Sequence, residues 1–102
     1  MTALVELAHC RAGDKGGDSL LVVVPYDSAD LERLVARLTP EAIAAHFGHR
    51  ADQVLLAPAP GLGALVVTLR GRLEGGVTRS MSIDPHGKTL SGLLLALEVP
   101  WS

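Results

Sequence analysis

The chain has 102 residues, a formal net charge of −2 and 48% hydrophobic residues, which is enough for one domain with a single core over residues 1–102. Only 3% of the residues are aromatic and there is no basic stripe, which argues against a stacking platform for single-stranded nucleic acid or a basic surface for duplex phosphates. Cys10 is the single cysteine, so an intramolecular disulfide and a cysteine-rich zinc site are excluded.

No segment of the sequence has the pattern of a membrane or targeting signal. The first six residues lack a positively charged segment followed by an apolar run, as a signal peptide would require. The longest apolar runs, 20–25 and 93–97, are far too short to cross a bilayer. We therefore expect a soluble, cytoplasmic protein with neither membrane nor nucleic acid as a partner.

The first half of the chain predicts two strands and then two helices. Residues 3–9 alternate as a strand does, residues 11–18 form a glycine-rich charged loop, and the apolar run 20–24 is typical of a central strand that ends at Pro25. Asp27 or Ser28 can cap a helix whose apolar stripe runs from Leu31 to Leu38. Thr39 followed by Pro40 predicts a second helix, to about residue 47, that Gly48 ends.

The second half predicts three more strands and a last helix. The strands cover residues 54–57, 65–70 and 80–84, with turns at 75–76 and 84–87, and the helix carries leucines on one stripe from Leu90 to Leu97. Strands and helices do not alternate one for one, which argues against a doubly wound parallel sheet.

This order of elements predicts an α+β fold, a two-layer sandwich with a mostly antiparallel sheet of four or five strands and helices on one face. The second face would carry polar residues such as Thr68, Arg70, Ser80 and Ser82. That face would be polar enough for water, although it could also meet a partner. We further expect Trp101, near the end of the chain, at or near a contact with another subunit or protein.

Residues 13–18 are the most unusual local feature, because three glycines and three charged residues follow one another. Glycines allow positive φ and close approach to a ligand, and successive N–H groups can hold an anion. Arg11 and Lys15 would add positive charge, while Asp14 and Asp18 could orient them or hold a hydroxyl. The alternative is a tight connection whose charges are solvated, and the sequence leaves both open.

Two other segments suggest anion binding more weakly. Residues 87–89 are reminiscent of a phosphate-binding loop, but the required earlier glycine is Ser82 here, and Pro85 and His86 interrupt the loop, so a nucleotide-hydrolase site is rejected. Lys88 at a helix N-terminus can still attract an anion or simply lie in solvent. Arg79, just past a glycine turn, can bind a carboxylate or phosphate or be solvated.

The histidines and the cysteine do not form a recognisable reactive group. His46 and His49 are three apart, but Gly48 lies between them and no third ligand has zinc spacing, so ordinary helix-end histidines are favoured over a metal site. His9 and Cys10 are strand neighbours whose side chains would point to opposite faces, so Cys10 is expected to be a packed residue. No cofactor is indicated.

Two segments together resemble a known family. Residues 8–18, AHCRAGDKGGD, resemble the opening "AHxRSGDKGxD" of the small ferredoxin-fold domain of the AtuA-like (acyclic terpene utilisation) family. Residues 75–90 are similar to that domain's closing "GGGxxRSLRxDxxGKxL". The order and spacing agree over nearly the whole chain, while Ala12 and Ser82 depart from the family's usual serine and basic residue.

The resemblance implies a ferredoxin-like α+β sandwich in terpenoid or branched acyl-CoA breakdown. In that family the domain often follows a much larger domain, and it also occurs as a separate small protein. The resemblance supplies no catalytic residue. The positions of this chain that match the family's segments and form our candidate anion-binding set are Arg11, Gly13, Asp14, Lys15, Gly16, Asp18, Arg79 and Lys88, to which the residues themselves add Gly17.

Three functions remain open from the sequence. The first is an accessory or binding subunit that works with a larger AtuA-type partner in acyl-CoA catabolism. The second is a small enzyme acting on an acyl-CoA or carboxylate, with Asp14 or Asp18 as base and Lys15 or Arg79 holding the anion. The third is a structural oligomerisation module. A homo-oligomer, a larger AtuA-type protein, and acyl-CoA or another anionic small molecule are the expected partners.

Overall fold

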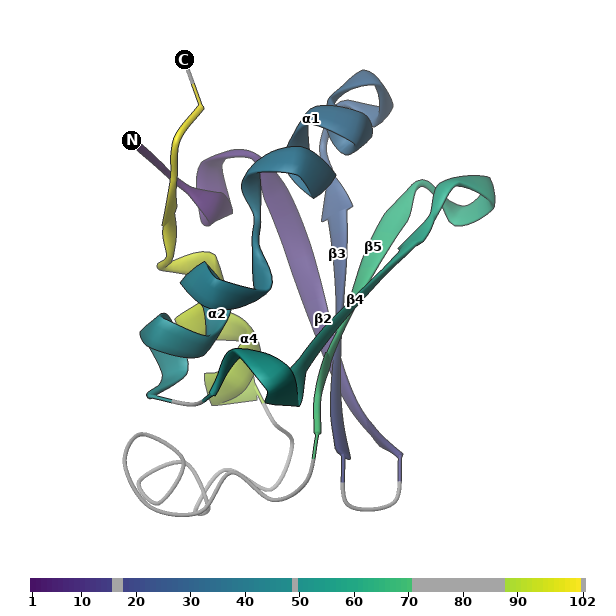
Figure 1. Ribbon diagram of the computed structural model, residues 1–102. Helices are drawn as coiled ribbons and strands as arrows, with labels where there is room; N and C mark the ends of the chain where they lie inside the picture. Colours follow the sequence, from purple (N-terminus) through teal and green to yellow (C-terminus); the bar gives the residue numbers. More distant parts are fainter. Residues whose placement is uncertain (16–17, 49, 71–87, 102) are drawn as a thin grey trace.

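The protein contains a four-stranded antiparallel sheet and a separate two-stranded one (Figure 1). The computed structural model describes residues 1–15, 18–48, 50–70 and 88–101. The larger sheet has the order β2-β3-β5-β4, formed by Ala8–Lys15, Asp18–Pro25, Ala64–Leu69 and Val54–Ala59 respectively. The smaller sheet pairs β1 (Thr2–Ala3) with β6 (Glu98–Val99) near the two ends of the chain.

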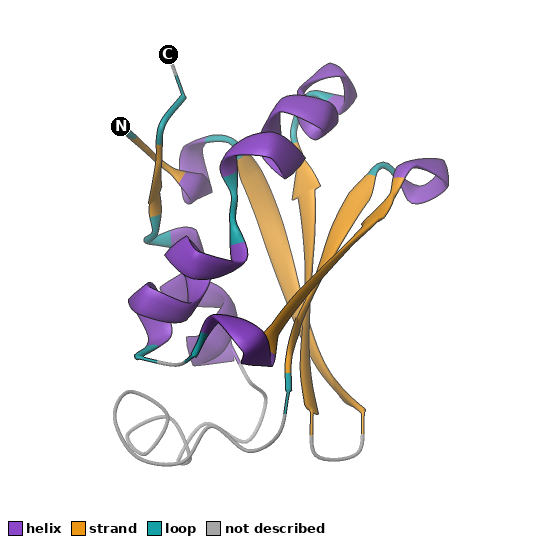
Figure 2. Cartoon of the chain, viewed as in Figure 1, coloured by secondary structure: helices purple, strands orange, loops and turns teal. Residues whose placement is uncertain are grey.

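The helices lie on one side of the larger sheet, as Figure 2 shows. They are α1 (Leu31–Arg37), α2 (Pro40–Phe47) and α4 (Lys88–Leu95). The first packs against β3 and β5, the second against β4 and the third against β2. Four 3-10 turns complete the described elements, at Leu4–Glu6, Ser28–Asp30, Ala51–Gln53 and Pro60–Leu62. The predicted α+β class with a mostly antiparallel sheet and helices on one face is confirmed.

Local signals in the sequence set the limits of α2. The Thr39 hydroxyl accepts a hydrogen bond from the Ala42 N–H at 3.2 Å, and Pro40 begins the helix. Gly48 ends it in the left-handed conformation, with a φ of 69°. Before α1, the Asp27 carboxylate accepts from the Ala29 N–H at 3.0 Å and caps the 3-10 turn that leads into the helix.

The core fills the space between the helices and one face of the larger sheet. Its largest fully buried side chains are aliphatic, as the low aromatic content requires. The helices and the sheet contribute Leu34, Leu38, Ile43, Leu94, Leu21, Val23, Leu65, Val67 and Leu69, each with no exposed surface. The predicted helix stripes therefore face the sheet, and burial of this aliphatic surface is the main stabilising contribution.

The predicted strand over residues 3–9 is wrong in its limits. Only Thr2 and Ala3 are extended there, the 3-10 turn Leu4–Glu6 follows, and β2 begins at Ala8. The turn places Leu4 fully inside the core, and the Leu4 N–H donates to the Leu97 carbonyl at 2.9 Å. The N-terminal segment thus pairs with the C-terminal one, a long-range contact that local alternation does not reveal.

The predicted loop over residues 11–18 is also largely wrong, because most of it is strand. Consecutive antiparallel pairs run from Arg11 with Val22 to Lys15 with Asp18, so β2 and β3 form a hairpin. Glycine and charged residues are tolerated because β2 is at the edge of the sheet that the described strands form. Gly16 and Gly17, which connect the two strands, lie outside the described residues, as do the predicted strand 80–84 and the turns at 75–76 and 84–87.

The described helices lie on one side of the larger sheet, and we call the opposite side the outer face. Opposite residues in an antiparallel pair share a face, so the register places there the aliphatic residues Leu20, Val22, Val24, Leu55, Ala57 and Val66. Thr68 shares this face, and Arg70 follows at its end, as predicted. The expectation of a polar face is nevertheless wrong for the described residues, most of which are aliphatic; Ser80 and Ser82 lie outside them.

Trp101 packs against the molecule's own core rather than projecting from it. It is half-buried beside the core cluster, and the guanidinium carbon of Arg33 lies 4.3 Å from the centre of its ring. Arg33 also donates a hydrogen bond to the Trp101 carbonyl, and Arg37 donates one to the Pro100 carbonyl at 2.7 Å. The last residues are therefore held against α1.

Candidate functional site

Several segments meet at the end of the larger sheet where β2 and β3 are connected, which we call the hairpin end. Figure 1 shows this end at the bottom of the view, where β5 also ends and α4 begins. The 3-10 turn Ala51–Gln53 enters β4 there. Segments far apart in the sequence, from residue 15 to residue 88, are thus brought to one end of the molecule.

The sheet register positions three polar residues side by side at the hairpin end. Leu69 pairs with both Ser19 and Val54, so the adjacent residues Asp18, Arg70 and Gln53 continue the same row. The Arg70 N–H donates to the Gln53 carbonyl at 2.7 Å, which holds the end of β5 against the start of β4. Together with Arg50 and Asp52, these residues line an open depression of about 390 Å³.

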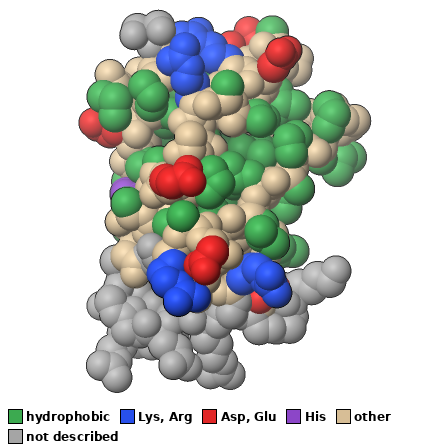
Figure 3. All heavy atoms as spheres, viewed as in Figure 1, with side chains coloured by type: hydrophobic (Ala, Val, Ile, Leu, Met, Phe, Trp, Pro, Cys, Tyr) green, Lys and Arg blue, Asp and Glu red, His purple; other side chains and the backbone are tan. Residues whose placement is uncertain are grey.

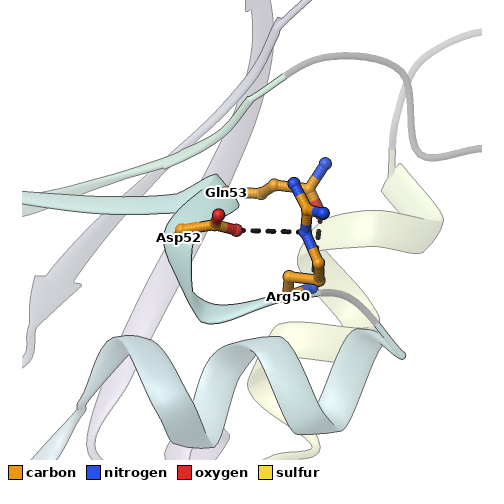
Figure 4. A network of polar contacts seen from close by, with 3 residues as sticks. All are labelled: Arg50, Asp52 and Gln53. Carbon is orange, nitrogen blue, oxygen red and sulfur yellow. Dashed lines mark hydrogen bonds and ion pairs between the residues drawn. The ribbon is translucent and has the colours of Figure 1, made fainter.

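Arg50 belongs to a small polar network within the 3-10 turn (Figure 4). Its Nε lies 3.2 Å from Asp52 Oδ1, and its backbone N–H donates to Gln53 Oε1 at 3.3 Å. The two charged side chains are 76% and 72% exposed. An ion pair this exposed contributes less than about 1 kcal/mol, so an anionic ligand can take the place of Asp52 beside Arg50.

The guanidinium of Arg70, unlike that of Arg50, has no ion-pair partner among the described residues. The side chain of Arg70 is exposed, and its guanidinium makes no hydrogen bond or ion pair with the residues that the structure describes. A guanidinium presents five N–H donors in a planar fork that matches a carboxylate or phosphate. Among the described residues, the depression therefore contains a donor group that a ligand oxyanion can use without breaking a contact of that group.

The structure distributes the predicted site residues over two places. Asp14 and Lys15 end β2 at the hairpin end, and Asp18, which lines the depression, is paired there with Lys15. Lys88 begins α4 at the same end of the molecule. The candidate residues Gly16, Gly17 and Arg79 lie outside the described residues, so the candidate anion-binding set as a whole stays a prediction.

Arg11 and Gly13 lie further along β2. Arg11 is exposed on the outer face opposite Val22, four residues before Lys15, which corresponds to about 13 Å of strand. Gly13 lies between them on the same face. Arg11 is therefore in the middle of the sheet rather than in the depression.

Sequence reasoning missed Arg50, Asp52 and Gln53 and gave Arg70 no role. Arg50 follows the predicted second helix, and Arg70 ends a strand, so neither stands in a recognisable motif. Only the pairing of β4 with β5 and of β5 with β3 brings them beside Asp18. These residues could have been found only from a prediction of which strands pair and in which register.

Cys10 is packed against the core, as predicted. Burial raises the pKa of the Cys10 thiol to about 11, and its side chain shares the core face of β2 while His9 lies on the outer face. His46 Nε2 is 2.5 Å from the Leu93 carbonyl and so links α2 to α4. Within the described ranges, no three histidine, cysteine or acidic side chains are grouped so that they could hold a metal ion.

In the part of the chain that the structure covers, every helix is too short or too polar to cross a lipid bilayer.

An antiparallel sheet with helices on one face defines a small α+β domain. The chain matches the family model of the AtuA ferredoxin-like domain over residues 2–100, and it belongs to that family. The family resemblance found in residues 8–18 and 75–90 is thereby confirmed. Searches of curated proteins and of solved structures each found no match.

Proposed function

We propose that this chain is an accessory binding domain that works with a larger AtuA-type protein in terpenoid or branched acyl-CoA catabolism. Membership of the AtuA ferredoxin-like family supports the metabolic setting. The observation that carries the proposal is the depression at the hairpin end, with the open guanidinium of Arg70 on its wall. In this account the domain contributes an anion-binding surface, and its partner contributes the rest of the site.

The ligand that suits this surface is an anionic part of a small molecule, such as a carboxylate or the phosphates of an acyl-CoA. Arg70 offers a paired set of donors for two oxygens of the ligand, and Arg50 adds a second positive charge beside it. Asp18 and Asp52 balance these charges, so binding depends on directed hydrogen bonds more than on net charge. A neutral terpene has no group that uses these donors.

The ligand side of the proposal is tested by titration calorimetry with a short-chain acyl-CoA, inorganic sulfate and a neutral terpene alcohol. We expect the two anions to bind and the alcohol not to bind. Arg70→Ala should weaken the binding of the acyl-CoA about ten-fold, since a hydrogen bond to a charged group is worth roughly 1.5 kcal/mol or more. Arg70→Lys keeps the charge but not the planar fork, so its affinity for the acyl-CoA should lie between those of the unchanged protein and Arg70→Ala.

Arg11→Ala is the matched control, because it removes the same charge from the middle of β2 rather than from the hairpin end. It should leave acyl-CoA affinity within about two-fold of the unchanged protein. Equal weakening by Arg11→Ala and Arg70→Ala would mean that only general charge attracts the ligand. Unchanged affinity in Arg70→Ala would refute the site.

The partner side is tested by co-purification of the tagged chain with native proteins, followed by mass spectrometry. We expect a protein that carries the larger AtuA-type domain to be retained. A tagged chain that repeatedly elutes with no such protein, under conditions that preserve other acyl-CoA enzyme complexes, would contradict the accessory role.

A further inference from the structure

The outer face contains two rows of residues that run across all four strands. The register joins Arg11, Val22, Val66 and Ala57 in one row. It joins Gly13, Leu20, Thr68 and Leu55 in the next. The two middle strands therefore present three aliphatic residues and a threonine, while the edge strands present one large and one small residue each.

This face is apolar without being part of the core. Leu55 is 48% exposed, and none of the outer-face aliphatics belongs to the core cluster or packs against it. In Figure 3, hydrophobic side chains gather over the β4 side of the molecule, between charged groups at its two ends. The neighbouring aliphatic residues Leu20, Val22 and Val66 are half-buried. A contiguous, partly exposed apolar surface is a feature of interaction sites.

The sizes of the edge residues are complementary to each other across the sheet. On β2, Arg11 is large and Gly13 has no side chain; on β4, Ala57 is small and Leu55 is large. A twofold axis parallel to the strands, lying between β3 and β5, would place β2 of one copy over β4 of another. Arg11 would then lie over Ala57 of the second copy, and Leu55 of the second copy would fill the space above Gly13.

The space above Gly13 is open in the single chain. A Cβ built on Gly13 has no other atom within 4 Å, and its φ is not positive, so glycine is not required there by the monomer's own packing or backbone. On the two middle strands, Val22 of one copy would contact Val66 of the second copy, and Leu20 would contact Thr68 of the second copy. These contacts are apolar or neutral, and they bring no like charges together.

The available area indicates how strong such a contact is. Four strands spaced about 4.8 Å apart give a width of roughly 19 Å, and the six residue steps from Val24 to Asp18 give a length of roughly 20 Å. The flat area is therefore roughly 400 Å² per copy, and a stacked pair covers at least about 800 Å² in total. This is the range of weak, reversible interfaces.

We propose that the outer face is the interface of a homodimer in which two sheets stack through Leu20, Val22, Leu55 and Val66, with Leu55 inserted above Gly13 of the other copy. Face-to-face stacking of two sheets within about 30° of parallel is a standard way to bury such a surface. The inference goes beyond the proposed function, since the stacked rows from Val24 to Leu20 lie on the sheet and only the edge of the interface reaches Asp18, which lines the anion depression. The proposal states which surface of the chain a second copy contacts.

Sedimentation velocity from about 10 µM to about 1 mM tests this interface. We expect the unchanged protein to shift from monomer to dimer within this range. Gly13→Leu fills the space that Leu55 needs and should weaken association at least about ten-fold, while circular dichroism shows that it still folds. The swapped variant Gly13→Leu/Leu55→Ala restores one large and one small partner and should recover most of the association.

Gly61→Leu is the matched control, because a Cβ there also has open space but lies in the 3-10 turn Pro60–Leu62. It should associate as the unchanged protein does. A chain that stays monomeric throughout the range, or a Gly13→Leu variant that dimerises normally, would overturn the homodimer. If the chain alone is monomeric but Gly13→Leu abolishes binding to a larger AtuA-type protein, the face belongs to that partner instead. Anion titration is a separate readout, so either proposal can fail while the other holds.

Discussion

Shortening Leu94 to alanine tests the packing of α4 most directly. Leu94 has no exposed surface and lies in the core cluster, and α4 packs against β2. The change removes one buried methine and two buried methyl groups without adding a polar atom or altering the backbone. Its effect on the free energy of unfolding therefore measures how closely α4 and the sheet fit together.

The expected loss of stability can be estimated from two contributions. Removing three buried carbon groups costs about 0.8 kcal/mol each, or roughly 2.4 kcal/mol. A residual cavity of roughly 50 Å³ adds about 1.2 kcal/mol at about 24 cal/mol per Å³. The sum, about 3–4 kcal/mol, is a large fraction of the roughly 5–15 kcal/mol by which domains of this kind are stable.

Urea denaturation followed by circular dichroism gives this quantity, provided the slope of the transition is unchanged. Leu62→Ala is the matched control, since Leu62 is 79% exposed and the same atoms are removed from solvent. It should cost less than about 0.5 kcal/mol. A loss below about 1 kcal/mol for Leu94→Ala, or equal losses for both variants, would refute the packing of α4 described above.

Two further predictions concern the cap of α2 and the cysteine. Thr39→Ala should lower the free energy of unfolding by about 1 kcal/mol, because the Ala42 N–H loses its hydroxyl partner; unchanged thermal unfolding would contradict the cap. Since burial raises the pKa of Cys10 to about 11, its alkylation by iodoacetamide should be slow near neutral pH and rise as the pH approaches that value. Alkylation near neutral pH at the rate of a free thiol in urea would show that Cys10 is not buried.

Local chemistry made the helices predictable. The hydroxyl of Thr39, the ring of Pro40 and the left-handed Gly48 act within one or two turns of α2, so the sequence alone fixes its limits. The apolar run 20–24 likewise falls inside β3. These signals do not depend on the rest of the fold.

The errors arose where long-range pairing decides the conformation. Leu4 lies in a 3-10 turn, and its N–H donates to the carbonyl of Leu97, which is distant in the sequence. The strand β6 has only two residues, too few to show an alternating pattern of apolar and polar residues. Residues 11–15 read as a loop because of their glycine and charges, yet pairing with β3 extends them. The outer face was expected to be polar because of Thr68 and Arg70. The sequence does not give the strand register that places Leu20, Val22 and Leu55 on the same face.

The candidate site was predictable only in part for the same reason. The hairpin residues Lys15 and Asp18 stand in a motif that the sequence reveals. Arg50 and Arg70 stand in none, and they join the depression because three strands meet in register at that end. Arg11 belongs to the same motif but lies in the middle of β2, away from the depression.

The central claim is that an oxyanion binds at the hairpin end, and nitrogen–proton NMR correlation spectra during an acyl-CoA titration test it most directly. The account predicts saturable shifts of the backbone amides of Asp18, Gln53 and Arg70, reproduced in part by sulfate and absent with a neutral terpene alcohol. Amides in the middle of the outer face, such as Val22, should not move. Shifts centred on Val22, or no shifts at the hairpin end at millimolar acyl-CoA, would contradict the claim.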